Sequence, residues 1–393
     1  MNNIYREQTP LEDWAFPFCP EPPHWTMHWE SIQARFSWIA AMAGVPQEAQ
    51  YHAEGDVLIH TRLVAEALVA LDEWRALPPG ERAIMFASAL LHDVAKQACT
   101  KIEEDGRIAS KNHARTGEKL ARQLLWEGHD FAEPVPFPCR EYIARLVRFH
   151  GLPLWFLDKP DAARAVIAAS QVVRLDRVAL LAEADVRGRI CQDRNELLAR
   201  IALFREFCKE QECYDGPRQF STHHSHFMYF RSENASPNYQ AYDDTQFEVV
   251  MMSGLPGAGK DHWLKNHLPG WPVISLDQLR RELKIAPTDT QGLVIQAAKE
   301  RARELLRQRR SFAWNATNTT KTTRRQLLDL FAAYHASIRI VYIDAPFAVL
   351  TGQNAARAES VPQEVIVRLM RKLDVPDLTE AHEVEWVWRK SIT

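Results

Sequence analysis

The residues best suited to chemistry form a glycine-rich loop that ends in a lysine, Gly254-Leu255-Pro256-Gly257-Ala258-Gly259-Lys260. The loop follows an apolar run at 247–252. Glycines let successive backbone N–H groups curl around an anion, and the lysine reaches the β and γ phosphates of a nucleotide. The N-terminus of a following helix adds partial positive charge. The spacing GxxxxGK therefore predicts an ATP-binding loop. Asp261, the next residue, is expected to belong to the same site.

Asp261 occupies the position where a Ser or Thr usually binds magnesium in such loops. A carboxylate is a good ligand for a hard cation. It is also a negative charge beside phosphates. We expect Asp261 to bind Mg²⁺ directly or through water. The alternative is that it only caps the helix after the loop.

Three further charged residues follow strands of the second half. Asp277 comes after the apolar run 271–276, at the strand end that borders the ligand crevice of a parallel sheet. It is placed to accept a proton from an attacking hydroxyl, or else it caps the next helix. Arg280 is placed to hold a phosphate. Arg357 is the candidate for the mobile cation that a kinase closes over the transferring phosphoryl group.

The first half carries a second set of reactive side chains. His92 and Asp93 follow an apolar run that should be buried, and a buried charge needs a partner such as a metal ion. Imidazole and carboxylate groups on facing helices commonly build a metal site. The other candidate ligands are His60, His113, His150 and Asp185.

Other histidines are less suited to this role. His129-Asp130 lies in a polar turn, so we expect a chance pairing. His223, His224 and His226 are expected to be solvated or to face a nucleotide rather than bind metal.

The elements that must position these residues differ between the two halves. The first half shows apolar residues at helical spacing and no convincing strand, which predicts an all-α domain over 1–212. The expected helices are 57–74, 81–96, 115–125, 141–149, 162–181 and 196–209.

The second half predicts an α/β domain. Residues 213–246 are polar and turn-rich, so we expect a connector there. Over 247–393 strands alternate with helices, which predicts a parallel sheet. The expected strands are 247–252, 271–276, 311–314 and 338–343.

Composition narrows the function classes. The chain has 393 residues, of which 46% are hydrophobic and 25% charged, as in ordinary globular proteins of two or three domains. Lys and Arg total 48 against 51 Asp and Glu. The net charge of −3 excludes a polycation that coats nucleic acid indiscriminately.

Cysteine usage and hydropathy bear on location. The six cysteines form no CxxC pair, so we expect reduced thiols and a cytoplasmic protein. The N-terminus lacks the apolar core of a signal peptide. The longest apolar stretches, such as 36–45 and 85–91, fall short of the roughly 18 residues that cross a bilayer. We expect no membrane partner.

The motifs of the second half resemble the polynucleotide 5'-kinase domain of phage and bacterial RNA-repair enzymes. GLPGAGK, SLDQLR, NATN and QNAAR followed by VPQEVI occur in the same order, and the resemblance covers about residues 247–390. It implies that Lys260 contacts the phosphates of ATP and that Asp277 is the general base on a 5'-hydroxyl. It also implies that Arg280 contacts the acceptor and that Arg357 is the lid arginine. Asp261 departs from the phage pattern, which leaves the mode of magnesium binding open.

The ordered His and Asp set of the first half is similar to that of the HD phosphohydrolase family. The resemblance implies one metal ion held by His60, His92, Asp93 and Asp185, and a second, with Asp93 bridging, held by His113 and His150. Lys96, one turn beyond Asp93, is either a contact for substrate phosphate or a surface lysine.

Together the halves resemble bacterial bifunctional end-healing enzymes. These remove a 2',3'-cyclic or terminal phosphate from one RNA end and phosphorylate the 5'-hydroxyl of the other. The implied cofactors are ATP, Mg²⁺ and one or two divalent transition metal ions. The implied partners are RNA or DNA ends, with an RNA ligase acting downstream. The alternatives are a small-molecule or nucleoside kinase fused to a nucleotide phosphohydrolase, and a nucleotide-sensing switch without turnover. The basic, Thr-rich run 317–325 favours a polymer.

Overall fold

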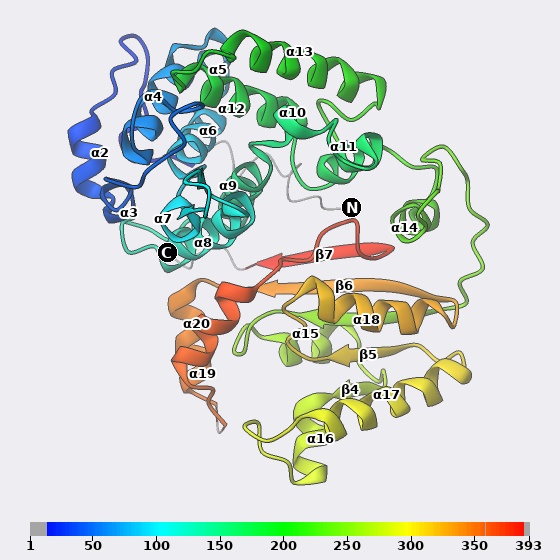
Figure 1. Ribbon diagram of the computed structural model, residues 1–393. Helices are drawn as coiled ribbons and strands as arrows, with labels where there is room; N and C mark the ends of the chain where they lie inside the picture. The colour runs from blue at the N-terminus through cyan, green and yellow to red at the C-terminus, as the bar shows by residue number, and fades with distance from the viewer. Residues whose placement is uncertain (1–13, 358, 389–393) are drawn as a thin grey trace. The chain divides into compact units, whose positions relative to one another are not determined.

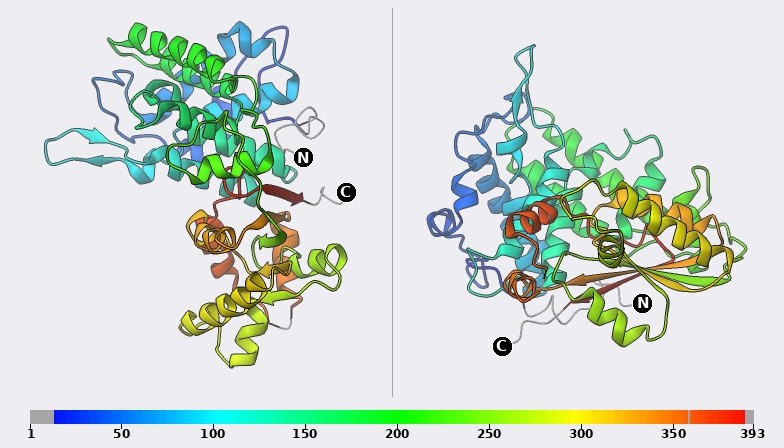
Figure 2. Two further views of the ribbon diagram at one scale, coloured as in Figure 1. Left: turned by 90° about the vertical axis from the view of Figure 1, so that its right-hand side faces the viewer. Right: turned by 90° about the horizontal axis from the view of Figure 1, so that it is seen from below.

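Two units of different secondary structure follow one another along the chain (Figures 1 and 2). The computed structural model describes residues 14–357 and 359–388. The first unit extends to Gln219 and the second begins at Phe220. The predicted connector 213–246 is therefore divided between them, and most of it belongs to the second unit.

The first unit is built from helices, as the sequence predicts. Their bounds are α2 Trp29–Arg35, α3 Ser37–Ala40, α4 Val57–Ala70, α5 Asp72–Arg75, α6 Pro79–Leu91, α7 Lys96–Cys99, α8 His113–Glu127, α9 Phe137–Phe149, α10 Leu152–Trp155, α11 Ala162–Ser170, α12 Leu175–Gly188 and α13 Arg194–Glu210. Helix α6 is apolar on nearly every side and almost entirely buried, as expected for a central helix. Helices α4, α9 and α12 pack around it.

The packing of α12 on α4 depends on a glycine. A Cβ atom at Gly188 would lie 2.7 Å from the backbone nitrogen of Val64 on α4. Only glycine allows the two backbones to come this close, and the close approach brings side chains of α4 and α12 together.

The first unit also contains a small hairpin, so the expectation of no strand there is wrong. Strands β1 Lys101–Ile102 and β2 Ile108–Ala109 pair antiparallel. The hairpin projects from the helices in the left view of Figure 2. Two-residue strands are too short to produce an alternating pattern that sequence reasoning could detect.

The connector residues are ordered by a short helix, α14 His223–Arg231, which Thr222 caps by accepting the Ser225 N–H. Phe227 and Tyr229 are buried. His224 is also buried, and its Nδ1 lies 3.1 Å from Nε2 of His382. The expectation that His224 is solvated or faces a nucleotide is therefore wrong, because this histidine packs in the interior of the second unit.

The second unit is a five-stranded parallel sheet with the order β4-β5-β3-β6-β7. The strands are β3 Phe247–Ser253, β4 Val273–Ser275, β5 Phe312–Asn315, β6 Ala336–Asp344 and β7 Glu383–Trp388, and the helices between them are α15 Lys260–His267, α16 Leu276–Leu283, α17 Gly292–Arg307, α18 Lys321–Ala332, α19 Phe347–Ala355 and α20 Gln363–Lys372. The predicted parallel sheet is confirmed (Figure 1). Strand β7 was not predicted.

Because every strand runs in the same direction, the carboxyl ends of the strands meet at one edge of the sheet. The glycine-rich loop follows β3 at this edge, and Asn315 ends β5 there. Within the described residues, no helix combines the length and apolar character needed to cross a bilayer. The six cysteines, all within the described residues, are thiols and not disulfides.

Candidate metal centre and phosphate-binding loop

The helical unit brings all six predicted metal ligands together from five helices. They are His60 on α4, His92 and Asp93 just after α6, His113 at the start of α8, His150 just after α9 and Asp185 on α12. Ligating atoms of His60, His92 and Asp93 lie within 4.8 Å of one another, as do those of Asp93, His113 and His150.

The hydrogen bonds of the histidines fix which ring nitrogen is available. Nδ1 of His92, His113 and His150 each lies 2.8 Å from a backbone carbonyl oxygen three residues earlier. A carbonyl only accepts, so each Nδ1 carries the proton, and the neutral form of each ring presents a lone pair at Nε2. Burial lowers the pKa of His150 to about 3, so this ring is neutral near pH 7.

These Nε2 atoms point at one another. Nε2 of His60 lies 3.3 Å from Nε2 of His92, and Nε2 of His113 lies 3.3 Å from Nε2 of His150. At His113 and His150 two lone pairs face each other, and they repel unless a cation lies near both. This geometry fits a divalent transition metal, for which neutral imidazole is a preferred ligand.

Asp93 lies between the two histidine pairs. Its Oδ2 is 3.2 Å from His92 Nε2, and its Oδ1 is 3.4 Å from His113 Nε2. Oδ1 is buried and makes no hydrogen bond to any described group. Burial raises the pKa of Asp93, but the charge of Lys96 outweighs it and holds the pKa well below its usual value. Asp93 is thus a buried carboxylate with one oxygen toward each histidine pair.

Asp185 is shared between the cluster and an arginine that the sequence did not suggest. Its Oδ1 lies 3.1 Å from Nε2 of His60, and Arg189 donates to both of its oxygens at 2.9 and 2.5 Å. Burial raises the pKa of Asp185, but the charge of Arg189 outweighs it and holds the pKa well below its usual value. Asp185 is therefore ionised and already has a cationic partner.

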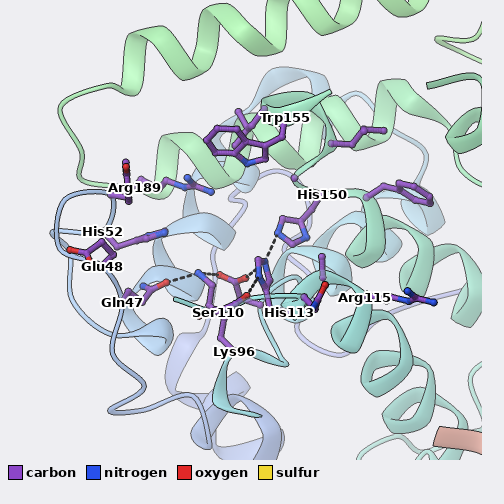
Figure 3. A pocket seen from close by; sticks show the side chains of 18 of the residues that line it. Gln47, Glu48, His52, Lys96, Ser110, His113, Arg115, His150, Trp155 and Arg189 are labelled. Atoms are coloured by element: carbon purple, nitrogen blue, oxygen red, sulfur yellow. Dashed lines mark hydrogen bonds and ion pairs between the residues drawn. The ribbon is translucent and has the colours of Figure 1, made fainter. Parts of the chain in front are cut away.

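Lys96 is a buried residue of this site and not a surface lysine. It is only 7% exposed, and its Nζ lies 2.7 Å from Asp93 Oδ2 and donates to Gln47 Oε1 at 2.7 Å. Figure 3 shows Lys96 between Gln47 and the cluster. His129, in contrast, is 77% exposed, as expected for a chance His-Asp pair.

Glu54, which precedes α4 and also contacts His52, supports His60 from outside the cluster. Oε1 of Glu54 lies 2.8 Å from His60 Nδ1 and 2.9 Å from His52 Nδ1, and the Glu54 side chain has no exposed surface. Its other oxygen accepts the backbone N–H of Ile190 at 2.8 Å. A carboxylate on the outer nitrogen of a ligating histidine fixes the ring and makes it a better ligand. Sequence reasoning missed Glu54 because nothing in the residues around it marks it as a partner of a metal ligand.

The cluster opens into a cavity of about 920 Å³ within the helical unit. His52, Asp93, Lys96, His113, His150 and Arg189 contribute to its wall (Figure 3). A molecule that enters this cavity can therefore reach Asp93, His113 and His150 of the cluster directly.

The glycine-rich loop of the second unit has a backbone that only glycine tolerates. Gly254 has φ +142°, and a Cβ there would lie 2.6 Å from the carbonyl oxygen of Ile343. Gly257 has φ +82°, and a Cβ there would lie 2.8 Å from the carbonyl oxygen of Leu350. Lys260 folds back over the loop and donates to the carbonyls of Gly254 and Leu255 at 2.9 Å. Burial lowers the pKa of Lys260 to about 8.

Asp261 has a polar partner at the end of the neighbouring strand. Nδ2 of Asn315 donates to Asp261 Oδ1 at 2.5 Å. The residue that precedes α15 is Gly259, which has no side chain to cap the helix. Asp261 thus projects toward the carboxyl ends of the strands, where its carboxylate is available to a cation.

Asp277 is flanked by two arginines. Arg280 pairs with its Oδ1, and Arg357 lies 3.6 Å from its Oδ2. The cap of α16 is Ser275, whose side chain accepts the Gln278 N–H, so Asp277 is not needed as a cap. Asp277 is 53% exposed and can reach a substrate.

The basic run 317–325 is less accessible than the sequence suggested. Arg324 is fully buried and donates to both carboxylate oxygens of Glu380 at 2.8 Å. Lys321 pairs with Asp377 at 3.1 Å. Two cations of the run therefore neutralise acidic residues of the same unit, so the run offers less free positive charge to a polymer than its sequence suggested.

Comparison with known proteins supports the loop assignment. The family described as an AAA domain matches residues 249–376. With the strand order and the loop geometry, this match shows that the second unit is a kinase-like P-loop domain.

Weaker similarity links part of the chain to proteins named multifunctional CCA protein. It is 29% identical over 152 residues to that of Xylella fastidiosa, covering 38% of this chain and 33% of that protein. It is 33% identical over 161 residues to that of Stenotrophomonas maltophilia, covering 39% of this chain and 35% of that protein. The chain thus spans about a third of the length of these curated relatives. A solved structure from Chloroflexus aurantiacus has a TM-score of 0.31 at 16% identity, over 37% of this chain and 86% of that one.

Proposed function

We propose that the protein is a bifunctional nucleic-acid end-healing enzyme. The P-loop unit transfers phosphate from ATP to a 5'-hydroxyl end of RNA or DNA. The helical unit removes a 2',3'-cyclic or terminal 2' or 3' phosphate. The observation that carries this proposal is the presence, in one chain, of converging imidazole nitrogens around the buried Asp93 and a separate P-loop with a nearby exposed carboxylate.

The kinase reaction follows from the residues at the edge of the sheet. The loop N–H groups and Lys260 bind the phosphates of ATP, and Lys260 exchanges its carbonyl contacts for phosphate oxygens. Asp277 accepts the proton of the 5'-hydroxyl while the hydroxyl oxygen forms a bond to the γ phosphorus. The bond between that phosphorus and the bridging oxygen of ADP breaks, and ADP leaves. Arg280 and Arg357 flank Asp277 and neutralise charge on the acceptor and on the transferring group. Asp261 would hold Mg²⁺, which supplies charge neutralisation between the phosphates.

The hydrolytic reaction uses the residues of the helical cavity. His60, His92, Asp93 and Asp185 would hold one metal ion, and Asp93, His113 and His150 a second. Such ions supply a hydroxide near neutral pH and stabilise charge on the phosphoryl group. Lys96 reaches into the same cavity from between Gln47 and Asp93 and is placed to bind a substrate phosphate oxygen.

The name of the relatives, multifunctional CCA protein, is compatible with more than one activity in a chain. One observation favours a second function. Arg324 and Lys321 pair with acidic residues of the same unit, and this removes part of the basic surface that would bind a polymer. In that alternative a small-molecule or nucleoside kinase is fused to a nucleotide phosphohydrolase. The third candidate function is a nucleotide-sensing switch, for which we expect no catalytic turnover at either site.

One assay separates these functions. The protein is incubated with ATP labelled at the γ phosphate and either a 5'-hydroxyl RNA oligomer or free nucleosides. We expect the oligomer to be labelled and the nucleosides not, with loss of labelling in Lys260→Ala. Preferential labelling of nucleosides would support the alternative kinase, and labelling of neither would support the switch.

A further inference from the structure

The cavity that holds the histidine cluster is much larger than a phosphate group requires. Its volume of about 920 Å³ is typical of sites for ligands the size of a nucleotide or larger. The cluster and Lys96 make only part of its wall. The remaining wall combines aromatic and cationic side chains, which is the combination that recognises nucleic acid single strands.

Trp155 is the largest of the three aromatic groups of that wall, the others being Tyr51 and Phe149. It ends helix α10, which begins just after His150, so the ring stands near the cluster in sequence and in space (Figure 3). Trp155 is 48% exposed, although tryptophan is rarely left open to solvent in a folded domain. An exposed indole on a cavity wall offers a flat surface on which a base can stack.

Trp155 is also supported from outside the cavity. The guanidinium carbon of Arg200 lies 5.4 Å from the ring centroid. Arg200 is itself held by Glu196 at 2.8 Å and by the carbonyl oxygen of Leu154 at 3.4 Å. A cation held against the ring fixes the indole in place and lowers the entropy that stacking of a base would cost.

Cationic residues line the same cavity. Outside the cluster they include Arg115, Arg148 and Lys159, and the acidic lining residues there are Glu48 and Asp193. One oxygen of Glu48 already accepts a backbone N–H of strand β2 at 3.0 Å. The excess of positive charge beyond the cluster suits a ligand that carries a second phosphate in addition to the one that is hydrolysed.

We propose that Trp155 is the stacking platform for the terminal base of a single-stranded nucleic-acid 3' end. The terminal phosphate lies at the cluster, and the preceding phosphate lies toward Arg115, Arg148 and Lys159. This inference rests on the proposed phosphohydrolase function and names its substrate as a polymer end, which a free mononucleotide would not satisfy. Base stacking on an aromatic side chain changes affinity on the order of 10–100-fold.

The test measures binding and hydrolysis with matched ligands. The binding probe is a short single-stranded RNA with fluorescein on its 5' end and a non-hydrolysable methylenephosphonate at its 3' end, titrated into the metal-loaded protein and followed by anisotropy. The dye blocks the 5'-hydroxyl, so the P-loop unit has no acceptor. A second probe is identical but lacks the terminal base.

We expect Trp155→Ala to weaken binding of the first probe by on the order of 10–100-fold and to leave binding of the abasic probe unchanged. Trp155→Phe should retain most of the affinity. Leu157→Ala is the matched control, because Leu157 lies two residues on, is 58% exposed and does not line the cavity. Metal content equal to that of wild type shows that the variants keep the folded cluster.

The outcomes separate the two levels of the proposal. If the wild-type protein hydrolyses neither β-glycerophosphate nor an RNA 3'-phosphate with any divalent metal, the phosphohydrolase function itself fails. If hydrolysis occurs but Trp155→Ala binds the two probes as wild type does, the stacking role is overturned. Equal wild-type affinity for the RNA probe and for the corresponding mononucleotide would overturn the assignment of a polymer end.

Discussion

Glu54 gives the sharpest test of the metal centre, because it touches a predicted ligand without belonging to the cluster. The substitution Glu54→Gln keeps the size and shape of the side chain. The amide oxygen can still accept the Ile190 N–H, which Glu54 accepts at 2.8 Å, so the local fold should persist. What is lost is the carboxylate charge 2.8 Å from Nδ1 of His60.

The size of the effect follows from the role of that carboxylate. It favours the His60 tautomer with a proton on Nδ1 and a lone pair on Nε2, and it makes Nε2 a better donor to a cation. Removal of such a partner typically weakens metal affinity about 10–100-fold, which corresponds to roughly 1.4–2.8 kcal/mol. Because His60 is one ligand of one proposed ion, we expect the loss to affect one metal equivalent.

The assay is a titration of metal-free protein with Mn²⁺, with the free ion followed by EPR. Glu66→Gln is the matched control. Glu66 lies on the same helix as His60, and its ion pair with Arg62 is solvent-exposed, so this change should leave metal affinity unaltered. An Mn²⁺ binding curve for Glu54→Gln that superimposes on wild type would refute the reasoning that places a metal ion at His60 Nε2.

Two predictions concern the P-loop unit. Asp277→Asn should lower the turnover number for 5'-phosphorylation by on the order of 10²–10⁴-fold with ATP affinity nearly unchanged, as measured by steady-state kinetics and nucleotide titration; normal turnover would exclude a general-base role. Asp261→Ala should raise the Mg²⁺ concentration for half-maximal kinase activity, and Asp261→Ser should recover much of the loss because a hydroxyl is the usual ligand there. Superimposable magnesium curves for wild type and both variants would mean that Asp261 is not a metal ligand.

The sequence predicted the fold where the periodicity was long and uniform. Helical spacing located most helices of the first unit, and four short apolar runs located four of the five strands. The predicted helix 162–181 is divided into two, because α11 ends at Ser170 and α12 begins at Leu175, after an extended Arg174. Strand β7 was missed because its charged and aromatic residues, EVEWVW, do not form an apolar run.

The candidate sites were likewise predicted in part. Ligand types and order along the chain identified His60 and Asp93, which the structure brings together. Glu54 and Asn315 were not found, since Glu54 is held by Ile190, 136 positions away, and Asn315 contacts Asp261, 54 positions away. Arg189 was also missed, although its partner Asp185 lies only four residues earlier. Arg324 was misjudged because a buried arginine and a phosphate-binding arginine have the same local sequence context.

The central claim is that one chain repairs both kinds of nucleic-acid end at two independent sites. The most direct measurement uses a single RNA with a 5'-hydroxyl and a 2',3'-cyclic phosphate, incubated with ATP, Mg²⁺ and Mn²⁺, and resolves both end groups by mass spectrometry. We predict that wild type converts both ends, that Asp93→Ala leaves the cyclic phosphate but phosphorylates the 5' end, and that Lys260→Ala does the reverse. Failure of wild type to convert either end, or loss of both reactions in one of these variants with its fold intact, would contradict the account.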